Sequence, residues 1–184
     1  MKKILTVIDM QNDFVQPKGK LSIKDANKLV KPMNKFLAEN RFDKVIATMD
    51  THSPVEYKNS AEGAMFPIHC VYGTHGWSLS VDIKQPYTTI KKDVFNVWEK
   101  NAPSLFRELD CTSNEIYVIG IAADYCVKDA VAGLLQNGFN TTIITDLTKG
   151  IGSEIGVVAD ENFAKYLQTK QLRMITSKEF QGGR

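Results

Sequence analysis

Short apolar runs rich in β-branched residues recur along the chain, and the longer stretches between them place apolar residues at helical spacing. Such runs are typical of strands that are buried on both faces of a sheet. The predicted strands are residues 4–8, 44–48, 88–90, 115–119, 141–145 and 173–175. The predicted helices are residues 25–40, 103–109, 159–169 and a segment around Cys126 that ends at Gly138. Pro32 either kinks the first helix or lies in the first turn of a helix that begins near Lys31.

The alternation of strands and helices predicts the α/β class. We expect three α/β/α layers around a central, mostly parallel sheet of five to six strands, with right-handed crossovers. The chain has 184 residues, which suits a single domain over residues 1–184. The sequence contains no internal repeat or low-complexity tract that would divide it.

Composition narrows the class of protein without naming a partner. Hydrophobic residues make up 43% and charged residues 24%, and a formal net charge of +2 gives no reason to expect nucleic acid or a membrane surface as partner. Three cysteines without paired spacing argue against a disulfide framework and for a reducing compartment. The apolar run after Lys3 is too short for a signal peptide, and no stretch is long enough to cross a bilayer, so we expect a cytoplasmic protein.

Polar or reactive side chains follow several of the predicted strands. Asp9 follows the first strand, Lys91 and Lys92 follow the third, and Cys126 follows the fourth. Because the carboxyl ends of parallel strands meet at one edge of a sheet, we expect an acid, an ammonium group and a thiol to share a crevice. Asp124 is a candidate N-cap that would place Cys126 in the first turn of a helix, where the dipole favours a thiolate.

This set of groups suits covalent catalysis. The carboxylate would take the thiol proton and the lysine would stabilise anions, while the thiolate attacks a carbonyl whose oxyanion is held by backbone N–H groups. Two plainer interpretations remain open at this point. Cys126 is a buried cysteine that only packs, or the three residues are unrelated strand ends.

Residues 53–89 form a long segment with little periodicity, and they include three prolines and three glycines. An irregular stretch of this length inside a compact domain is usually functional. The segment follows a strand that leads into Asp50 and His52, and it contains Glu56, Glu62 and His69. As at Asp9, a buried strand thus leads into polar, ligand-capable residues at its carboxyl end.

Several short motifs occur in order along the chain. They are Asp9–Phe14 after the first strand, Asp50-Thr-His52, Phe66–Cys70 followed by Gly73-Thr74 and Gly76, Lys92 before Phe95, and Gly120–Val127 around Cys126. They span about residues 4–150, and as a set they resemble the isochorismatase-like cysteine hydrolases, and within them the nicotinamidases.

The resemblance assigns roles at the predicted strand ends. It implies that Cys126 is the nucleophile, Asp9 the base and Lys92 the third member of a triad. Lys92 matches better than Lys91, because the family's lysine lies three residues before one aromatic residue and six before another.

The resemblance also implies an oxyanion site and an aromatic pocket. Family members carry a cis peptide that corresponds to the bond between Ile121 and Ala122, and the N–H groups of Ala122 and Cys126 would hold the oxyanion. The family commonly has threonine where this chain has Ala123, which removes a hydroxyl but no backbone donor. The implied pocket residues are Phe14, Trp77 and Tyr125.

A divalent metal ion beside the triad is implied in the same way, with zinc favoured and iron or manganese as alternatives. Asp50, His52 and His69 match the family's ligands directly. Glu62 is the favoured fourth ligand, and Glu56 is the alternative because it falls where a more typical member has histidine. Such nitrogen and oxygen donors suit a borderline divalent metal. Asp50 and His52 could instead belong to a loop without an ion, since metal-free relatives exist.

The expected activity is the hydrolysis of nicotinamide to nicotinate and ammonia, a step of NAD salvage. Three alternatives share the fold: hydrolysis of another small amide such as an N-carbamoyl compound or ureide without a metal, isochorismate hydrolysis, and ligand binding without catalysis. The expected partner is a small-molecule amide, with neither nucleic acid nor membrane, and the family favours a homo-oligomer. Cys70 is expected to be structural, Cys111 a loop thiol and His75 a surface residue.

Overall fold

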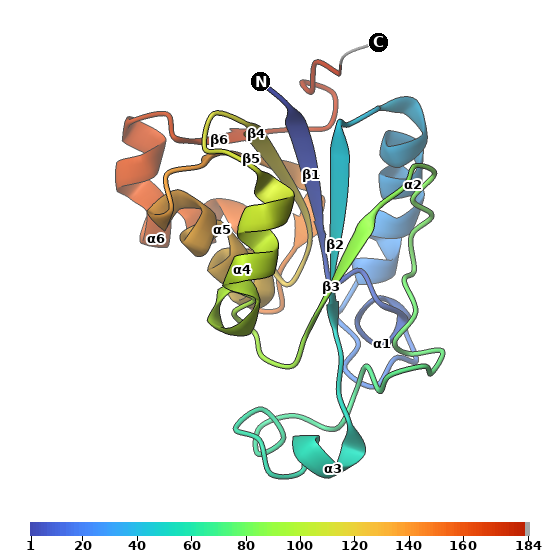
Figure 1. Cartoon of the computed structure of the whole chain (residues 1–184). Helices are drawn as coiled ribbons and strands as arrows, with labels where there is room; N and C mark the ends of the chain where they lie inside the picture. Colours follow the sequence, from blue (N-terminus) through green and yellow to red (C-terminus); the bar gives the residue numbers. More distant parts are fainter. Residues whose placement is uncertain (183–184) are drawn as a thin grey trace.

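The computed structural model describes residues 1–182, in which a six-stranded sheet is covered by helices on both faces (Figure 1). Every neighbouring pair of strands is parallel, and the strand order is β3-β2-β1-β4-β5-β6. The strands are β1 (Lys3–Ile8), β2 (Lys44–Asp50), β3 (Thr88–Lys92), β4 (Glu115–Ile121), β5 (Asn140–Lys149) and β6 (Leu172–Ile175). The predicted α/β class and parallel sheet are confirmed.

Alternate residues of the central strands enter two separate cores. On β1, Ile4 and Ile8 belong to one core, and Leu5 and Val7 belong to the other. The first core is shared with α4 (Trp98–Leu109), α5 (Lys128–Gln136) and α6 (Ile155–Gln168), and the second with α1 (Asn12–Val15), η1 (Ala26–Leu29) and α2 (Val30–Glu39). Figure 1 shows these two groups of helices on opposite sides of the sheet. A strand buried on both faces needs apolar residues at every position, which explains the continuous runs in the sequence.

Several elements begin or end away from the predicted bounds. β2, β3 and β4 each continue two residues further than predicted, so that Asp50, Lys92 and Ile121 are strand residues. α4 begins at Trp98 and contains Pro103, whereas a start at Pro103 is predicted. The indole N–H of Trp98 donates to the carbonyl oxygen of Ala130 at 3.0 Å, which ties the first turn of α4 to α5. Proline alone favours a helix start at Pro103, but the contact between Trp98 and α5 accompanies an earlier start of α4.

The helix near Pro32 is the shorter of the two alternatives. Residues 26–29 form a 3₁₀ turn, and α2 runs from Val30 to Glu39, so that Pro32 lies in its first turn. Proline is tolerated there because the first N–H groups of a helix have no partner within the helix. α6 begins at Ile155, four residues before the predicted start.

The strand order places a topological switch point between β1 and β4. From β1 the chain proceeds outward to β2 and β3, and then crosses to β4 on the other side of β1. In open parallel sheets ligands bind at the carboxyl edge beside such a point. Asp9 directly follows β1, and Cys126 lies in the turn that follows β4. The two central candidates for catalysis thus flank the crevice that the topology creates.

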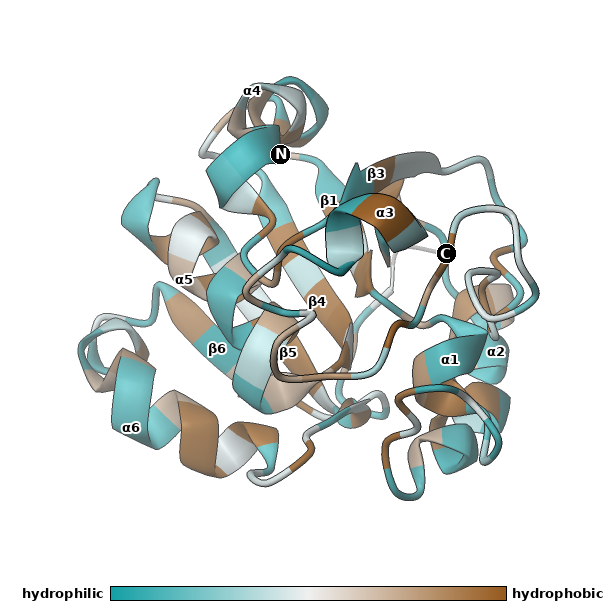
Figure 2. Cartoon of the chain, turned by 90° about the horizontal axis from the view of Figure 1, so that it is seen from below, coloured by the Kyte–Doolittle hydropathy of each residue, from teal (hydrophilic) through white to brown (hydrophobic). Residues whose placement is uncertain are grey.

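The segment after β2 crosses the carboxyl edge of the sheet. It contains one short helix, α3 (Pro54–Tyr57), which Figure 1 places beyond the end of β2. Figure 2, a view from below, shows α3 on the near side of the sheet, with α4, α5 and α6 to one side and α1 and α2 to the other. Among residues 1–182, no helix combines the length and the apolar character that crossing a membrane requires.

Candidate active site

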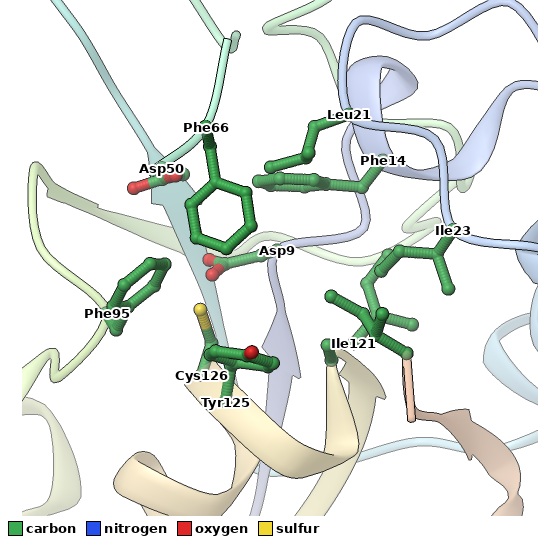
Figure 3. Close-up of a pocket in the computed structure, with 12 residues that line it drawn as sticks. Asp9, Phe14, Leu21, Ile23, Asp50, Phe66, Phe95, Ile121, Tyr125 and Cys126 are labelled. Carbon is green, nitrogen blue, oxygen red and sulfur yellow. The ribbon is translucent and has the colours of Figure 1, made fainter. Parts of the chain in front are cut away.

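Asp9, Lys92 and Cys126 meet at the switch point, although they come from three different strand ends. The ammonium nitrogen of Lys92 lies 2.7 Å from Oδ2 of Asp9 and donates to Sγ of Cys126 at 3.5 Å. All three side chains are buried. In Figure 3 the sulfur of Cys126 and the carboxylate of Asp9 face each other. Lys91 is exposed, and its ammonium group lies 4.2 Å from the ring centre of Tyr72, so the structure places Lys92, not Lys91, with the other two residues.

Burial and charge set the protonation of this group. Burial by itself would lower the pKa of Lys92, but the carboxylates of Asp50 and Asp9 raise it well above its usual value, so Lys92 is an ammonium ion. Burial raises the pKa of the Cys126 thiol well above its usual value, although Lys92 opposes this effect. The resting cysteine is therefore a thiol, in contrast to the thiolate expected in the first turn of a helix.

The two carboxylate oxygens of Asp9 have different surroundings. Oδ1 accepts a hydrogen bond from the hydroxyl of Thr48 at 2.6 Å. Oδ2 is buried, and it is paired with the ammonium nitrogen of Lys92, 2.7 Å away. Oδ2 thus shares the ammonium group of Lys92 with Sγ of Cys126.

The turn between β4 and α5 carries Cys126. The peptide between Ile121 and Ala122 is cis, as predicted. Residues 123–127 form one turn of π-helix, in which the N–H groups of Tyr125 and Val127 both donate to the carbonyl oxygen of Ala122. Ala122 and Cys126 line the same cavity. The structure thus brings both residues of the predicted oxyanion site to one cavity.

Asp124 does not cap the helix, so this prediction is wrong. Its carboxylate instead accepts hydrogen bonds from the N–H groups of Ile151, Gly152 and Ser153, at 2.9, 2.7 and 3.2 Å. Burial would raise the pKa of Asp124, but these bonds hold it below its usual value. The loop after β5 offers three backbone donors at once, and these outcompete a cap on the helix to which Asp124 belongs. The loop is thereby fixed to the turn that carries the thiol.

Four ligand-capable side chains converge next to the triad: Asp50, His52, Glu62 and His69. All are buried, and their nearest ligand atoms lie within 4.8 Å of one another. Nε2 of His52 and Nε2 of His69 each lie 3.0 Å from Oδ2 of Asp50, and Nε2 of His69 lies 3.3 Å from Oε1 of Glu62. Glu56 is exposed on α3 and outside the group, so the structure favours Glu62 over Glu56.

The donor set fits a metal ion. Both carboxylate oxygens of Glu62 are buried without a hydrogen-bond partner among residues 1–182, which is costly unless a cation satisfies them. Nδ1 of His69 lies 2.9 Å from the carbonyl oxygen of Pro67, and a bond there leaves Nε2 free to bind a metal. Without an ion, burial would lower the pKa of His69, but the carboxylates of Asp50 and Glu62 beside its Nε2 raise it to about 9, so these carboxylates favour a positive charge at this point.

Asp50 connects the triad to this second group. Its Oδ1 accepts from Lys92 at 3.2 Å, while Oδ2 faces both histidines. Burial would raise the pKa of Asp50, but Lys92 and the two histidines hold it well below its usual range. Gln11 fixes the backbone of Asp50, since its amide donates to the Asp50 carbonyl at 2.8 Å and accepts from the Asp50 N–H at 2.7 Å. The sequence places Gln11 in the Asp9–Phe14 motif, but no role was predicted for it.

A cavity of about 390 Å³, including its opening to solvent, lies in front of Cys126 (Figure 3). Apart from Asp9 and Asp50, its walls are apolar or aromatic, and they include the predicted residues Phe14 and Tyr125. The unpredicted wall residues are Leu21, Ile23, Phe66, Phe95, Ile121 and Ile151. In sequence these apolar side chains look the same as core residues.

Trp77 does not line the cavity, which corrects the prediction. Its indole N–H donates to the hydroxyl of Thr51 at 3.0 Å, and its ring packs against Tyr72. The indole nitrogen is thus held by the residue that follows β2, and Trp77 is not among the residues that line the cavity. The other cysteines are free thiols, Cys70 buried and Cys111 exposed, as expected.

The chain is similar to known proteins over most of its length. The model of the isochorismatase domain matches residues 3–174. The nicotinamidase/pyrazinamidase of Mycobacterium tuberculosis is 28% identical over 189 residues, covering 95% of this chain and 99% of that protein. The nicotinamidase of Saccharomyces cerevisiae is 25% identical over 198 residues, covering 85% of this chain and 92% of that protein.

Solved structures share the fold at lower identity. The pyrazinamidase of Pyrococcus horikoshii in complex with zinc has a TM-score of 0.77 at 23% identity, covering 96% of this chain and 99% of that one. PnC1 of L. infantum in complex with nicotinate has a TM-score of 0.81 at 22% identity, covering 98% and 96%. The similarity extends over nearly the whole of each chain.

Proposed function

Because the chain belongs to the isochorismatase family, we propose that it hydrolyses nicotinamide to nicotinate and ammonia through a thioester on Cys126. The observation that carries the proposal is the contact of Lys92 with both Asp9 and Cys126 at the base of an apolar cavity. The names of the relatives support the substrate, since several are nicotinamidases and one structure contains nicotinate.

The triad supplies a base, a nucleophile and a cation. Sγ of Cys126 attacks the amide carbonyl carbon, and the thiol proton passes to Oδ2 of Asp9. When the tetrahedral intermediate collapses, the C–N bond breaks and Asp9 returns the proton to the leaving nitrogen, which departs as ammonia. Water then attacks the thioester and gives a proton to Asp9, and this proton restores the thiol as the carboxylic acid is released. Lys92 stabilises the negative charge on Asp9 and on sulfur throughout.

The turn before α5 provides the proposed oxyanion site. The N–H groups of Ala122 and Cys126 are the donors that would hold the carbonyl oxygen as it becomes negative. The cavity walls favour a flat, uncharged ring, since Phe14 and Tyr125 offer aromatic surfaces and most of the other lining residues are apolar.

Asp50, His52, Glu62 and His69 are the proposed ligands of a divalent ion, with zinc favoured over iron or manganese. The unpartnered oxygens of Glu62 support this assignment, as does the zinc complex of the Pyrococcus relative. When bound, the ion would provide a Lewis-acidic position for the ring nitrogen of the substrate. Asp50 would orient the ion relative to Lys92, since it contacts both sets of residues.

An ammonia-release assay tests the proposed reaction. Purified protein should release ammonia from nicotinamide and from pyrazinamide, and Cys126→Ala should abolish the release without changing the circular dichroism spectrum. Cys111→Ala, at the exposed thiol, is the matched control and should keep full activity. Undiminished ammonia release by Cys126→Ala would refute the thioester. Release only from N-carbamoyl compounds would assign the protein to the other class of small amides.

Metal analysis tests the proposed ligands. Protein purified without chelator should carry about one divalent ion per chain, and His69→Asn should lose most of it because one of two nitrogen donors is removed. Glu56→Gln, on α3 but outside the group, should retain the ion. An equal metal content in all three proteins would contradict the assignment.

A further inference from the structure

Thr48 contacts the proposed base directly, from the strand beside it. Its side chain is 2% exposed, and its hydroxyl donates to Oδ1 of Asp9 at 2.6 Å. The Asp9 N–H also approaches this hydroxyl oxygen, at 3.3 Å. Hydrogen bonds to a charged acceptor are the stronger kind, so this contact holds the carboxylate in one orientation.

The contact distinguishes the two oxygens of the base. With Oδ1 occupied by Thr48, Oδ2 is left as the oxygen that faces Lys92, at 2.7 Å, beside the thiol that Lys92 also contacts. We propose that Thr48 is a positioning residue, whose hydroxyl fixes Asp9 so that Oδ2 takes the proton of Cys126. The part of this proposal that concerns the hydrolysis reaction rests on the proposed function. The part that concerns transfer of the Cys126 proton to Asp9 does not.

If Thr48 had only a structural role, replacing another buried threonine in the same space should have the same effect on activity. The side chain borders a small apolar space between the sheet and α4, which Thr6 of β1 also borders. The hydroxyl of Thr6 donates to the carbonyl oxygen of Tyr117 at 3.1 Å, and no catalytic group accepts from it. Thr6 is therefore a matched control: the same residue type in the same space, without the contact to the base.

Kinetics of three variants test the proposal with nicotinamide as substrate. Thr48→Val should lower kcat by about tenfold to a hundredfold with KM changed less than twofold, because the hydrogen bond to a charged group is lost. Thr48→Ser keeps the hydroxyl and should retain kcat within about threefold. Thr6→Val should lower the melting temperature but keep kcat. Equal kcat values for Thr48→Val and Thr6→Val, or a tenfold loss in Thr48→Ser, would overturn the proposal.

A second measurement does not depend on the substrate. In a Cys111→Ala background, the rate at which iodoacetamide alkylates Cys126 at pH 7 reports how readily the thiol loses its proton, and mass spectrometry follows it. Thr48→Val should slow alkylation about tenfold or more, whereas Thr48→Ser and Thr6→Val should not. Unchanged alkylation in Thr48→Val would refute the positioning role. The wild-type protein could be inactive on nicotinamide while the variants still differ in alkylation rate as described. This result would refute only the proposed substrate.

Discussion

At the scale of single residues, the environment of Cys126 determines when it can react. Burial raises the pKa of its thiol, and the carboxylates of Asp9 and Asp50 contribute in the same direction. The positive charge of Lys92 only partly offsets these effects. The cysteine is thus protonated at rest and depends on Asp9 to accept its proton when a substrate arrives. Such a site protects a buried nucleophile from oxidants and alkylating agents between turnovers.

This environment predicts the pH dependence of alkylation in the Cys111→Ala protein. A thiol with a raised pKa keeps its proton to higher pH, and only the thiolate reacts, so the rate at Cys126 should still be increasing above pH 9. Iodoacetamide labelling from pH 6 to pH 10, followed by peptide mass spectrometry, measures it. A rate that reaches a plateau below pH 8 would show that the resting cysteine is already a thiolate.

Single residues also show where sequence information ends. Asp9 and Cys126 could be identified as candidates because each lies after a buried strand, and the family resemblance supplied their roles. The choice of Lys92 over Lys91 came from the family's spacing, and the alternation of β3 explains it, since successive side chains point to opposite faces. The contacts of Trp77 and Asp124 could not be predicted, because their partners, Thr51 and residues 151–153, become neighbours only in the fold.

At the scale of elements, the loop after β5 is connected to the turn that carries the nucleophile. Asp124 makes this connection through three backbone N–H groups, and Ile151 on the same loop forms part of the cavity wall. A change at Asp124 is therefore expected to alter the substrate cavity without touching the triad.

Asp124→Ala should raise KM for nicotinamide several-fold and lower the free energy of unfolding by about 1.5–3 kcal/mol, since hydrogen bonds to a charged group are lost. Asp146→Ala is the matched control, because Asp146 likewise accepts from the backbone and hydroxyl of Ser177, in another loop. It should lose stability but keep KM. Steady-state kinetics and urea unfolding measure both quantities, and equal KM values in the two variants would disprove the link to the cavity.

Elements could be predicted from apolar periodicity, but their ends could not. The strand regions were all found because a run buried on both faces has an unmistakable composition. Their extensions to Asp50 and Lys92 were missed, since a polar residue at the end of a run signals the end of a strand unless a buried partner balances it. Here the negative charge of Asp50 is balanced by Lys92 on the neighbouring strand, whose ammonium nitrogen lies 3.2 Å from Oδ1 of Asp50. Strand order was not predicted, because the runs do not differ enough to specify neighbours.

At the scale of the whole molecule, the first part of the segment that follows β2 and crosses the carboxyl edge buries few of its side chains. In residues 53–68, only Tyr57 and Glu62 are buried. Glu62 belongs to the proposed metal site, whose other ligands lie at the end of β2 and at His69. The ion would therefore connect this segment to the sheet as well as take part in binding the substrate.

Metal removal should consequently reduce stability and local order together. An ion at a hundred times its Kd contributes about 2.7 kcal/mol, which corresponds to a fall of roughly 5–10 °C in melting temperature after chelation. Limited proteolysis should then cut within residues 53–68 first, and added zinc should reverse both effects. Differential scanning calorimetry and mapping of the first cleavage site check this. An unchanged melting temperature with chelator would argue against an ion at this position.

The double contact of Asp50 has an evolutionary consequence. One carboxylate serves both as a proposed metal ligand and as a counter-ion of Lys92. A lineage that abandoned the metal could lose His52, Glu62 and His69 one after another without unbalancing the triad. It could not lose Asp50 so freely, because a buried ammonium ion would be left with one fewer anion. The acid at position 50 should therefore outlast the histidines around it, as a trace of the metal site in descendants that no longer bind one.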